Sequence, residues 1–180
     1  MERLDVAIIG SGPAGIEAAI NMKIRKKSFL LFGTEQMSRK LVTAPRIDNY
    51  LGFPGISGKD LQGMFQKHME KMEIAIRPQQ VQMIYHMGDH FSLAAGEDTF
   101  EATSLILATG ISHDKLFEGE EAFLGRGVGY CATCDAPLYR GKTVTVLGYT
   151  EEAVHEANYV AELAGKVYYV PMAKTETPLD

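Results

Sequence analysis

The chain has 180 residues, 46% of them apolar, and a formal net charge of −5 from 18 basic and 23 acidic residues. This balance argues against a nucleic-acid-binding protein, which carries a basic stripe, and no segment approaches the roughly 20 apolar residues of a membrane-spanning helix. The start of the chain lacks the pattern of a secretory signal peptide, so we expect a cytoplasmic protein with no membrane and no nucleic-acid partner.

The first expected elements form a βαβ unit. Residues 4–9 are a short apolar run, typical of a strand that is buried on both faces. A glycine-rich turn follows, then an alanine-rich helix over residues 16–24 and a second apolar run over residues 29–32. This order predicts two parallel strands connected by a helix.

The turn after the first strand carries the spacing G-x-G-x-x-G over Gly10, Gly12 and Gly15. The first glycine permits a tight turn, the second lets the backbone approach a pyrophosphate, and the third lets helix and strand pack closely. Glu35 follows Gly15 by twenty positions, where an acidic side chain can hydrogen-bond a ribose hydroxyl. The sequence therefore predicts a dinucleotide site at the helix N-terminus, in preference to a glycine-rich turn that binds nothing.

Beyond this unit the chain alternates between turns, one long helix and short strands. We expect a turn-rich stretch over residues 45–58, a helix that Asp60 caps and that ends near residue 72, and a strand over residues 74–76. Further strands are expected as an antiparallel meander over residues 81–86, 91–94 and 99–101, and as a separate buried strand over residues 105–110.

A second βαβ unit is expected near the end of the chain. Its strands cover residues 143–147 and 167–170, and its helix covers residues 151–164. Two such units predict an α/β protein with two nucleotide-binding-type domains rather than a tandem repeat of short motifs.

Cys131 and Cys134 are the only cysteines of the chain, and Asp135 follows them directly. Two thiols are too few ligands for a closed zinc site, which needs four, so we expect no metal. If the segment begins a helix, both sulfurs lie on nearly the same face of its first turn, where the helix dipole and free N–H groups favour thiolate over thiol. The spacing predicts a redox-active dithiol–disulfide pair rather than a chance pair of buried cysteines.

Taken together, these motifs make the chain resemble the low-molecular-weight flavoprotein thioredoxin reductases. The resemblance rests on the Gly-Ser-Gly-Pro-Ala-Gly turn, Asn49 in a loop before Pro54-Gly55, the strand over residues 105–110 and the segment over residues 125–135. It covers nearly the whole chain, and the cysteine segment is its most specific part. It implies two Rossmann-like domains of the three-layer β/β/α FAD/NAD(P)-binding fold, with FAD at the first fingerprint.

The resemblance also implies roles for individual residues. Cys131 and Cys134 would form a redox disulfide that faces the flavin, with Cys134 nearest the isoalloxazine and Cys131 attacking the disulfide of a thioredoxin partner. Asp135 would manage the accompanying proton, which suits a carboxylate whose pKa is raised beside a buried thiol. The residues expected to bind FAD are Gly10, Gly12, Pro13, Ala14, Gly15, Glu35, Asn49, Thr109 and Gly110.

The second βαβ unit departs from the family pattern. Its turn keeps Gly148, but Thr150 replaces the second glycine, and its side chain would stand where a pyrophosphate needs bare backbone. Glu151 and Glu152 place carboxylates where they repel phosphate, and no arginine follows the second strand to grip a 2′-phosphate. We therefore expect poor NADP binding, with Tyr149 either covering the cavity that a nicotinamide would enter or lying at the surface of the turn.

This combination resembles the ferredoxin-dependent flavin thioredoxin reductases, which keep the fold and the cysteine pair but have lost the NADPH site. The leading hypothesis is therefore a thioredoxin-disulfide reductase that receives electrons from reduced ferredoxin through FAD. Two alternatives stay open: a divergent NAD(P)H-dependent thioredoxin reductase, and a non-catalytic flavin or thiol redox-sensing module.

The expected FAD-binding domain covers residues 1–112, and the expected central, NADPH-like domain with the cysteine pair covers residues 113–180. Family members are longer and return to the FAD domain through a C-terminal segment. The resemblance therefore implies a chain that ends before the fold is complete, and a homodimer as the assembly.

Overall fold

The structure is a computed structural model that describes residues 3–110 and 117–173. The chain divides into two compact units. The first contains Met1–Arg46 and Ile56–Leu116, and the second contains Ile47–Gly55 and Phe117–Asp180. The boundary predicted between residues 112 and 113 lies outside the described residues and stays a prediction. The assignment of Ile47–Gly55 to the second unit is a feature that the sequence did not indicate.

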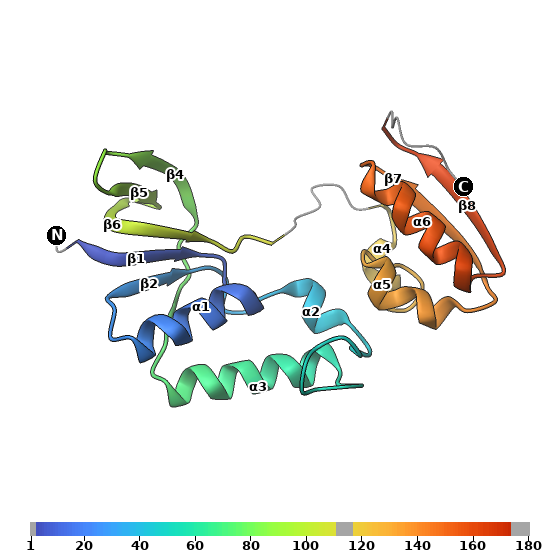
Figure 1. The fold of residues 1–180 in the computed structure, drawn as a ribbon, viewed down its shortest axis with the longest axis horizontal. Coiled ribbons are helices and arrows are strands. Elements are labelled where there is room, and N and C mark those ends of the chain that lie inside the picture. The colour runs from blue at the N-terminus through green and yellow to red at the C-terminus, as the bar shows by residue number, and fades with distance from the viewer. Residues whose placement is uncertain (1–2, 111–116, 174–180) are drawn as a thin grey trace. The chain divides into compact units, whose positions relative to one another are not determined.

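The first unit is built on a six-stranded sheet with the order β3-β2-β1-β6-β5-β4 (Figure 1). Four strands run parallel to one another, namely β1 (Leu4–Ile9), β2 (Phe29–Phe32), β3 (Ile76–Arg77) and β6 (Asp98–Leu107). The sheet continues with two antiparallel strands, β5 (Phe91–Ala95) and β4 (Val81–His86). A parallel core of the kind that binds dinucleotides is thus joined to the predicted antiparallel meander.

β1 lies inside this sheet because its apolar side chains are buried on both faces. Ile8 packs on one face with Leu31 of β2 and with Ile16 of the helix α1 (Pro13–Ile24). Ala7 packs on the other face, in the cluster that also contains Leu93 of the meander. The helix α3 (Gly58–Lys71) contacts α1 and extends the first cluster (Figure 1).

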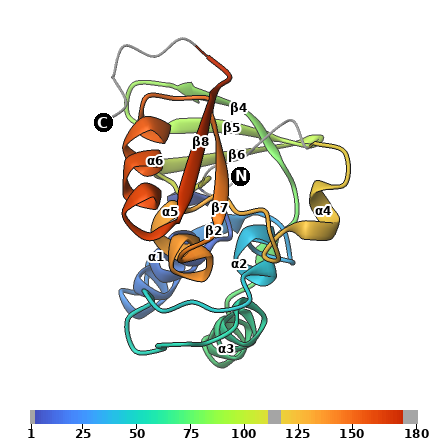
Figure 2. The ribbon, with the colours of Figure 1, turned by 90° about the vertical axis from the view of Figure 1, so that its right-hand side faces the viewer.

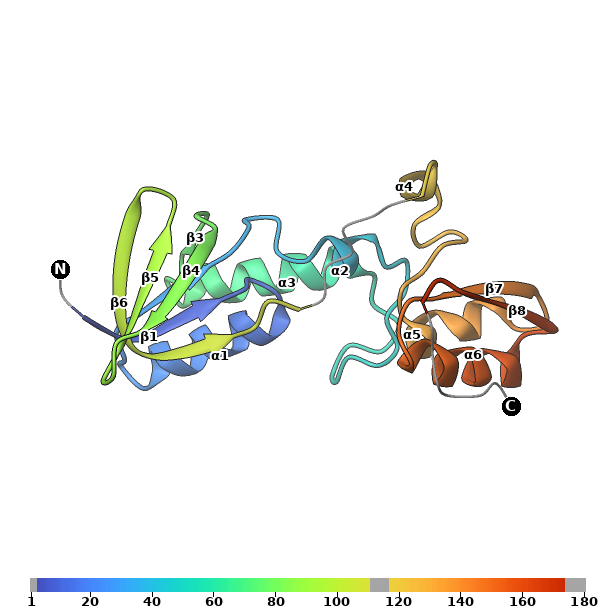
Figure 3. The same ribbon diagram turned by 90° about the horizontal axis from the view of Figure 1, so that it is seen from above.

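β6 combines two strands that the sequence analysis separated. Its first half pairs antiparallel with β5, and its second half pairs parallel with β1, ending with Ile9 opposite Leu107 (Figure 3). The prediction of separate strands over residues 99–101 and 105–110 was wrong, because Thr103 and Ser104 are exposed positions of one continuous strand rather than a polar break. Leu107 is 66% exposed, so the end of this strand is not buried as predicted.

Two helices of the first unit begin after a serine cap. Ser57 Oγ accepts the N–H of Asp60 at 3.1 Å, so the cap of α3 lies three residues before the predicted Asp60. Asp60 lies in the first turn instead, where its charge suits the helix dipole. Ser38 Oγ caps the short helix α2 (Arg39–Thr43), which the sequence did not indicate, by accepting the N–H of Leu41 at 3.3 Å.

The second unit contains the predicted second βαβ unit. β7 (Thr143–Gly148) and β8 (Lys166–Pro171) are parallel, and α6 (Glu152–Leu163) lies along one face of the pair (Figure 2). Three short helices come before β7 in the chain: α4 (Glu120–Phe123), α5 (Ala132–Asp135), which contains Cys134, and the 3₁₀ helix η1 (Ala136–Tyr139). Both units have the mixed α/β architecture that the sequence predicted. Each helix of the described residues is too short or too polar to span a lipid bilayer.

Candidate active site

The fingerprint turn between β1 and α1 depends on two close backbone approaches. Gly10 has a φ of +115°, a conformation that favours glycine, and a Cβ there would lie 2.0 Å from the carbonyl oxygen of Ala108. A Cβ on Gly15 would lie 1.8 Å from the carbonyl oxygen of Gly10. The first and third glycines therefore have the turn-forming and packing roles that the fingerprint assigns to them.

Gly12 stands in open space at the N-cap of α1. A Cβ built there would meet no heavy atom within 4 Å, and the first turn, which contains Pro13 and Ala14, holds no acidic side chain. The unbonded backbone N–H groups of a helix start, together with the helix dipole, attract anions. The residues present therefore fit the pyrophosphate of FAD, which this turn would hold.

Ser11 connects the fingerprint turn to the segment that follows β2. Its side chain is 4% exposed, and its Oγ donates to the backbone carbonyl of Thr34 at 2.8 Å. Glu35 follows Thr34 and is exposed, as a residue that contacts a ribose would be. Sequence reasoning did not single out Ser11, whose only signal was a hydroxyl group between two glycines.

The end of β6 brings the other predicted FAD contacts of this unit to the same turn. The N–H of Ala108 donates to the carbonyl of Ile9 at 2.8 Å, and its own carbonyl faces Gly10. Thr109 and Gly110 follow directly and are exposed, and Gly110 has a φ of +66°. The structure therefore gathers these residues around the fingerprint, and their contact with FAD stays a prediction.

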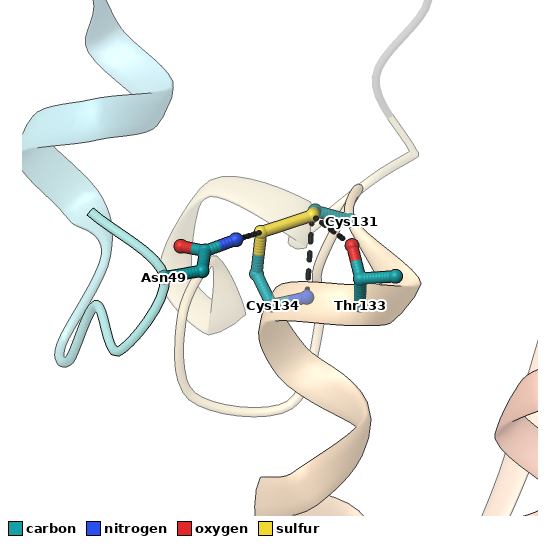
Figure 4. The surroundings of a disulfide bond; sticks show 4 residues. All are labelled: Asn49, Cys131, Thr133 and Cys134. Carbon is teal, nitrogen blue, oxygen red and sulfur yellow. Dashed lines mark hydrogen bonds between the residues drawn. A yellow bond between two sulfur atoms is a disulfide. The ribbon is translucent and has the colours of Figure 1, made fainter. Parts of the chain in front are cut away.

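Cys131 and Cys134 form a disulfide in the second unit, with Cα atoms 5.3 Å apart (Figure 4). Cys131 is the N-cap of α5, and its Sγ accepts the backbone N–H of Cys134 at 3.3 Å. Oγ1 of Thr133 lies 3.4 Å from the same sulfur. Because α5 has only four residues, these local contacts, rather than the expected helix dipole, favour negative charge on Cys131. Within the described ranges, no group of three or more His, Cys, Asp or Glu side chains would hold a metal ion.

Asn49 lies beside this disulfide (Figure 4), in the segment Ile47–Gly55 of the second unit. Its Nδ2 donates to Sγ of Cys134 at 3.7 Å. The N–H of Gly55 donates to the carbonyl of Ile47 at 2.9 Å and closes the segment on itself. The structure thus makes Asn49 a hydrogen-bond donor to Cys134, and its predicted contact with FAD stays a prediction.

Asp135 is partly buried at the end of α5. A Cβ on Gly129 would lie 2.0 Å from Oδ2 of Asp135, so the missing side chain of Gly129 leaves the room that the carboxyl group occupies. Burial raises the pKa of Asp135, and a hydrogen bond to the backbone of Cys131 partly opposes this shift. A carboxyl group with a raised pKa beside the disulfide suits the predicted proton transfer. Sequence reasoning missed the part of Gly129 in this arrangement.

The second fingerprint turn follows β7 and differs from the first. Gly148 is not among the glycines with a positive φ, and a Cβ there would lie 2.0 Å from the hydroxyl oxygen of Tyr169. This hydroxyl group is buried and has no hydrogen-bond partner among the described residues. Gly148 therefore provides the space that Tyr169 occupies, and its match to the fingerprint is not by itself a sign of a nucleotide site.

The residues after Gly148 carry polar side chains into this turn. Tyr149 is 50% exposed, and Thr150, Glu151 and Glu152 are exposed as well. Glu151 is the N-cap of α6, and Glu152 lies in its first turn. Hydroxyl and carboxylate groups therefore stand where a phosphate-binding turn has bare backbone.

A sequence profile described as pyridine nucleotide-disulphide oxidoreductase matches residues 4–177. The chain belongs to this family. The thioredoxin reductase of Mycoplasma genitalium is 35% identical over 168 residues, which are 92% of this chain and 53% of that protein. A solved ferredoxin-flavin thioredoxin reductase from Clostridium acetobutylicum is 54% identical, with a TM-score of 0.62 over 100% of this chain and 63% of that chain. For the thioredoxin reductase from Streptococcus pyogenes, the identity is 33% and the TM-score is 0.78, over 93% of this chain and 55% of that chain.

This membership, together with the identity to thioredoxin reductases, confirms the predicted resemblance to that family and the predicted α/β fold. It also supports FAD as the cofactor. The chain spans about half the length of the curated relatives that it matches.

Proposed function

We propose that the protein is a flavin-dependent thioredoxin-disulfide reductase in which Cys131 and Cys134 carry electrons from FAD to thioredoxin. One observation carries this proposal: each sulfur of the disulfide has a neighbouring donor, the N–H of Cys134 for one and Nδ2 of Asn49 for the other. Donors that stabilise a thiolate favour a disulfide that is broken and re-formed during turnover over a purely structural one. FAD, bound at the first fingerprint, would supply the electron pair.

The thiol chemistry then follows from the positions of the side chains. The Cys131–Cys134 bond accepts two electrons and breaks, which leaves one thiolate and, after uptake of one proton, one thiol. The raised pKa of Asp135 suits it to hold and return this proton. The Cys131 thiolate, stabilised by the N–H of Cys134, attacks the disulfide of thioredoxin, and one thioredoxin sulfur leaves as a thiolate. Cys134 gives up its proton and attacks Cys131, which restores the disulfide and releases reduced thioredoxin.

The proposed electron donor is reduced ferredoxin, which delivers one electron at a time. The second fingerprint supports this choice, because Thr150 and the carboxylates of Glu151 and Glu152 oppose a bound pyrophosphate, and because Gly148 serves the packing of Tyr169. The similarity to a protein described as a ferredoxin-flavin thioredoxin reductase supports the same donor.

A divergent NAD(P)H-dependent thioredoxin reductase is the second candidate. The parallel pair β7 and β8, with α6 between them in the chain, favours it because this unit keeps the topology of a nucleotide-binding domain. A redox-sensing module that never passes electrons to thioredoxin is the third reading of the same cysteine pair.

Stopped-flow spectroscopy of the full-length protein distinguishes these candidates. Reduced ferredoxin should bleach the flavin absorbance rapidly and NADPH should not, and thioredoxin added afterwards should restore the absorbance. Rapid bleaching by NADPH would show that the proposed donor is wrong. Bleaching by ferredoxin without any reduction of thioredoxin would identify the sensing module.

The two cysteine-to-serine variants test the assigned roles and serve as matched controls for each other. Cys134→Ser should keep FAD, lose turnover and trap thioredoxin as a mixed disulfide at Cys131. Cys131→Ser should also keep FAD and lose turnover, but trap no thioredoxin. Trapping by Cys131→Ser instead would reverse the roles of the two thiols.

The resemblance also motivates proposals on assembly and location, namely a homodimer in the cytoplasm with the domain boundary near residue 112. Sedimentation of the full-length protein checks the first, and cell fractionation checks the second. A monomer at micromolar concentration, or recovery with the membrane or periplasmic fraction, would contradict them.

A further inference from the structure

Glu120 is a buried carboxylate at the start of α4 and takes no part in the proposed thiol chemistry. It is 5% exposed, and burial of a carboxylate is costly unless its oxygens are hydrogen-bonded. Its Oε2 accepts the N–H of Phe117 at 2.8 Å, and its Oε1 accepts the hydroxyl of Tyr130. One side chain thus joins the two ends of the segment over residues 117–130.

The chain between these two ends is closed by its own backbone. The N–H of Val128 donates to the carbonyl of Phe123 at 3.0 Å, and the N–H of Gly125 donates to the carbonyl of Val128 at 2.8 Å. This tight turn directs Tyr130 back towards Glu120. The hydrogen bond between the two side chains then fixes the end of the segment that leads into the cysteine pair.

Tyr130 directly precedes Cys131. Burial raises the pKa of Tyr130 to about 12, and the hydrogen bond and negative charge of Glu120 add to this shift. The phenol therefore stays protonated and donates to Glu120 throughout the physiological pH range. Cys131 is held on one side by Tyr130 and on the other by α5, in which its sulfur meets the N–H of Cys134.

We propose that Glu120 is a positioning residue for Cys131, which acts through Tyr130 and keeps the sulfur aligned with the N–H of Cys134 in the reduced protein. This inference rests on the proposed function, because it concerns the thiol assigned to attack thioredoxin. A hydrogen bond to a thiolate is stronger than one to a disulfide sulfur, so its loss destabilises the reduced form more than the oxidised form. Loosening Tyr130 therefore makes the cysteine couple more reducing.

The test compares Tyr130→Phe and Glu120→Gln with the unsubstituted full-length protein. Two quantities are measured: the equilibrium constant of the cysteine couple against a dithiothreitol redox buffer, and the ratio of iodoacetamide alkylation at Cys131 and Cys134 after reduction. We expect each substitution to shift the equilibrium constant by about tenfold, or about 30 mV, towards a more reducing couple. The preference for alkylation at Cys131 should fall by a similar factor.

Further variants make this test specific. The double variant should shift no further than either single one, because both changes remove the same contact. Glu118→Gln and Tyr168→Phe replace exposed residues of the same types in the same unit and should leave both quantities unchanged. Tyr130→Phe removes a single oxygen atom, so it keeps the test available if Glu120→Gln fails to fold.

The outcomes separate this inference from the proposed function. If the variants melt earlier but keep the potential and the alkylation ratio, Glu120 is purely structural and the positioning role is wrong. If they shift the potential as expected while the unsubstituted protein does not reduce thioredoxin, the positioning role stands and the proposed function fails.

Discussion

Gly12→Ala should separate FAD binding from the stability of the fold. The φ of Gly12 is −75°, which any L-residue adopts, and the added methyl group would meet no heavy atom within 4 Å. The expected cost to the fold is therefore limited to the poorer N-cap preference of alanine, about 1 kcal/mol. The same methyl group would keep a pyrophosphate away from the backbone of the turn. We expect FAD to bind about a hundredfold more weakly, which corresponds to roughly 3 kcal/mol.

Gly15→Ala is the matched contrast. Its methyl group would lie 1.8 Å from the carbonyl oxygen of Gly10, where ordinary contact begins near 3.4 Å, so α1 would have to move by about 1.5 Å from the turn. Overpacking of this kind costs ~1–3 kcal/mol or more, so this variant should lose stability as well as FAD. FAD affinity is measured by flavin fluorescence titration, and stability by thermal melting of the FAD-free proteins. A Gly12→Ala protein with unchanged FAD affinity, or one that melts as early as Gly15→Ala, would refute the reasoning.

Three further predictions concern the second unit. Asn49→Leu removes the hydrogen-bond donor to Cys134. The equilibrium constant of the cysteine couple should shift about threefold towards a more reducing couple. An unchanged reduction potential would contradict the donor role of Asn49. Burial raises the pKa of Asp135 in the folded protein. Protonation of this carboxyl group therefore stabilises the fold fully below its pKa in the unfolded chain, about 4, and this stabilisation is lost as pH rises through the raised pKa. As pH rises from about 4 to 7, the melting temperature of Asp135→Asn should therefore rise relative to that of the unsubstituted protein. A difference in melting temperature that stays constant with pH would show that this linkage is absent. Gly148→Ala presses a methyl group onto the hydroxyl and the ring of Tyr169, with Cζ of the ring only 2.4 Å from the added Cβ, and should cost ~1–3 kcal/mol in denaturant unfolding. Tyr169→Phe should not restore this loss, because it keeps the ring carbons in place. A Gly148→Ala protein as stable as the unsubstituted one would contradict this packing.

The parts of the fold that depend on short-range contacts and on the apolar pattern of single elements were predictable from the sequence. The turn around Gly10 and Gly15 was one of them, because each glycine is required by a backbone contact within the turn or with the adjacent strand. The second βαβ unit was another, since its strands and helix have distinct apolar patterns. The continuity of β6 was not predictable, because Thr103 and Ser104 look the same in a turn as at the exposed positions of a strand.

The parts of the candidate site that depend on contacts between distant residues were not predictable. Asn49 and Cys134 are separated by 85 positions, and no pattern in the sequence indicates that a loop of one segment meets the sulfur of another. Gly148 shows a different limit of the sequence, because it matches the first glycine of the fingerprint although the packing of Tyr169 accounts for it. Packing and ligand binding can require the same residue type, and the sequence alone does not separate them.

The pairing of β6 with β1 has a consequence for the order in which the first unit assembles. β1, α1 and β2 are consecutive in the chain, and so are β4, β5 and β6, so each group forms through local contacts. The pairing of Leu4 with Ala102 joins the groups and closes a loop of roughly 100 residues, which is a slow event. This pairing ends at Ile9, directly before the fingerprint turn. The rate of FAD binding during refolding should therefore follow the pairing of β6 with β1 rather than the earlier formation of α1. FAD binding would then measure when the sheet of the first unit closes.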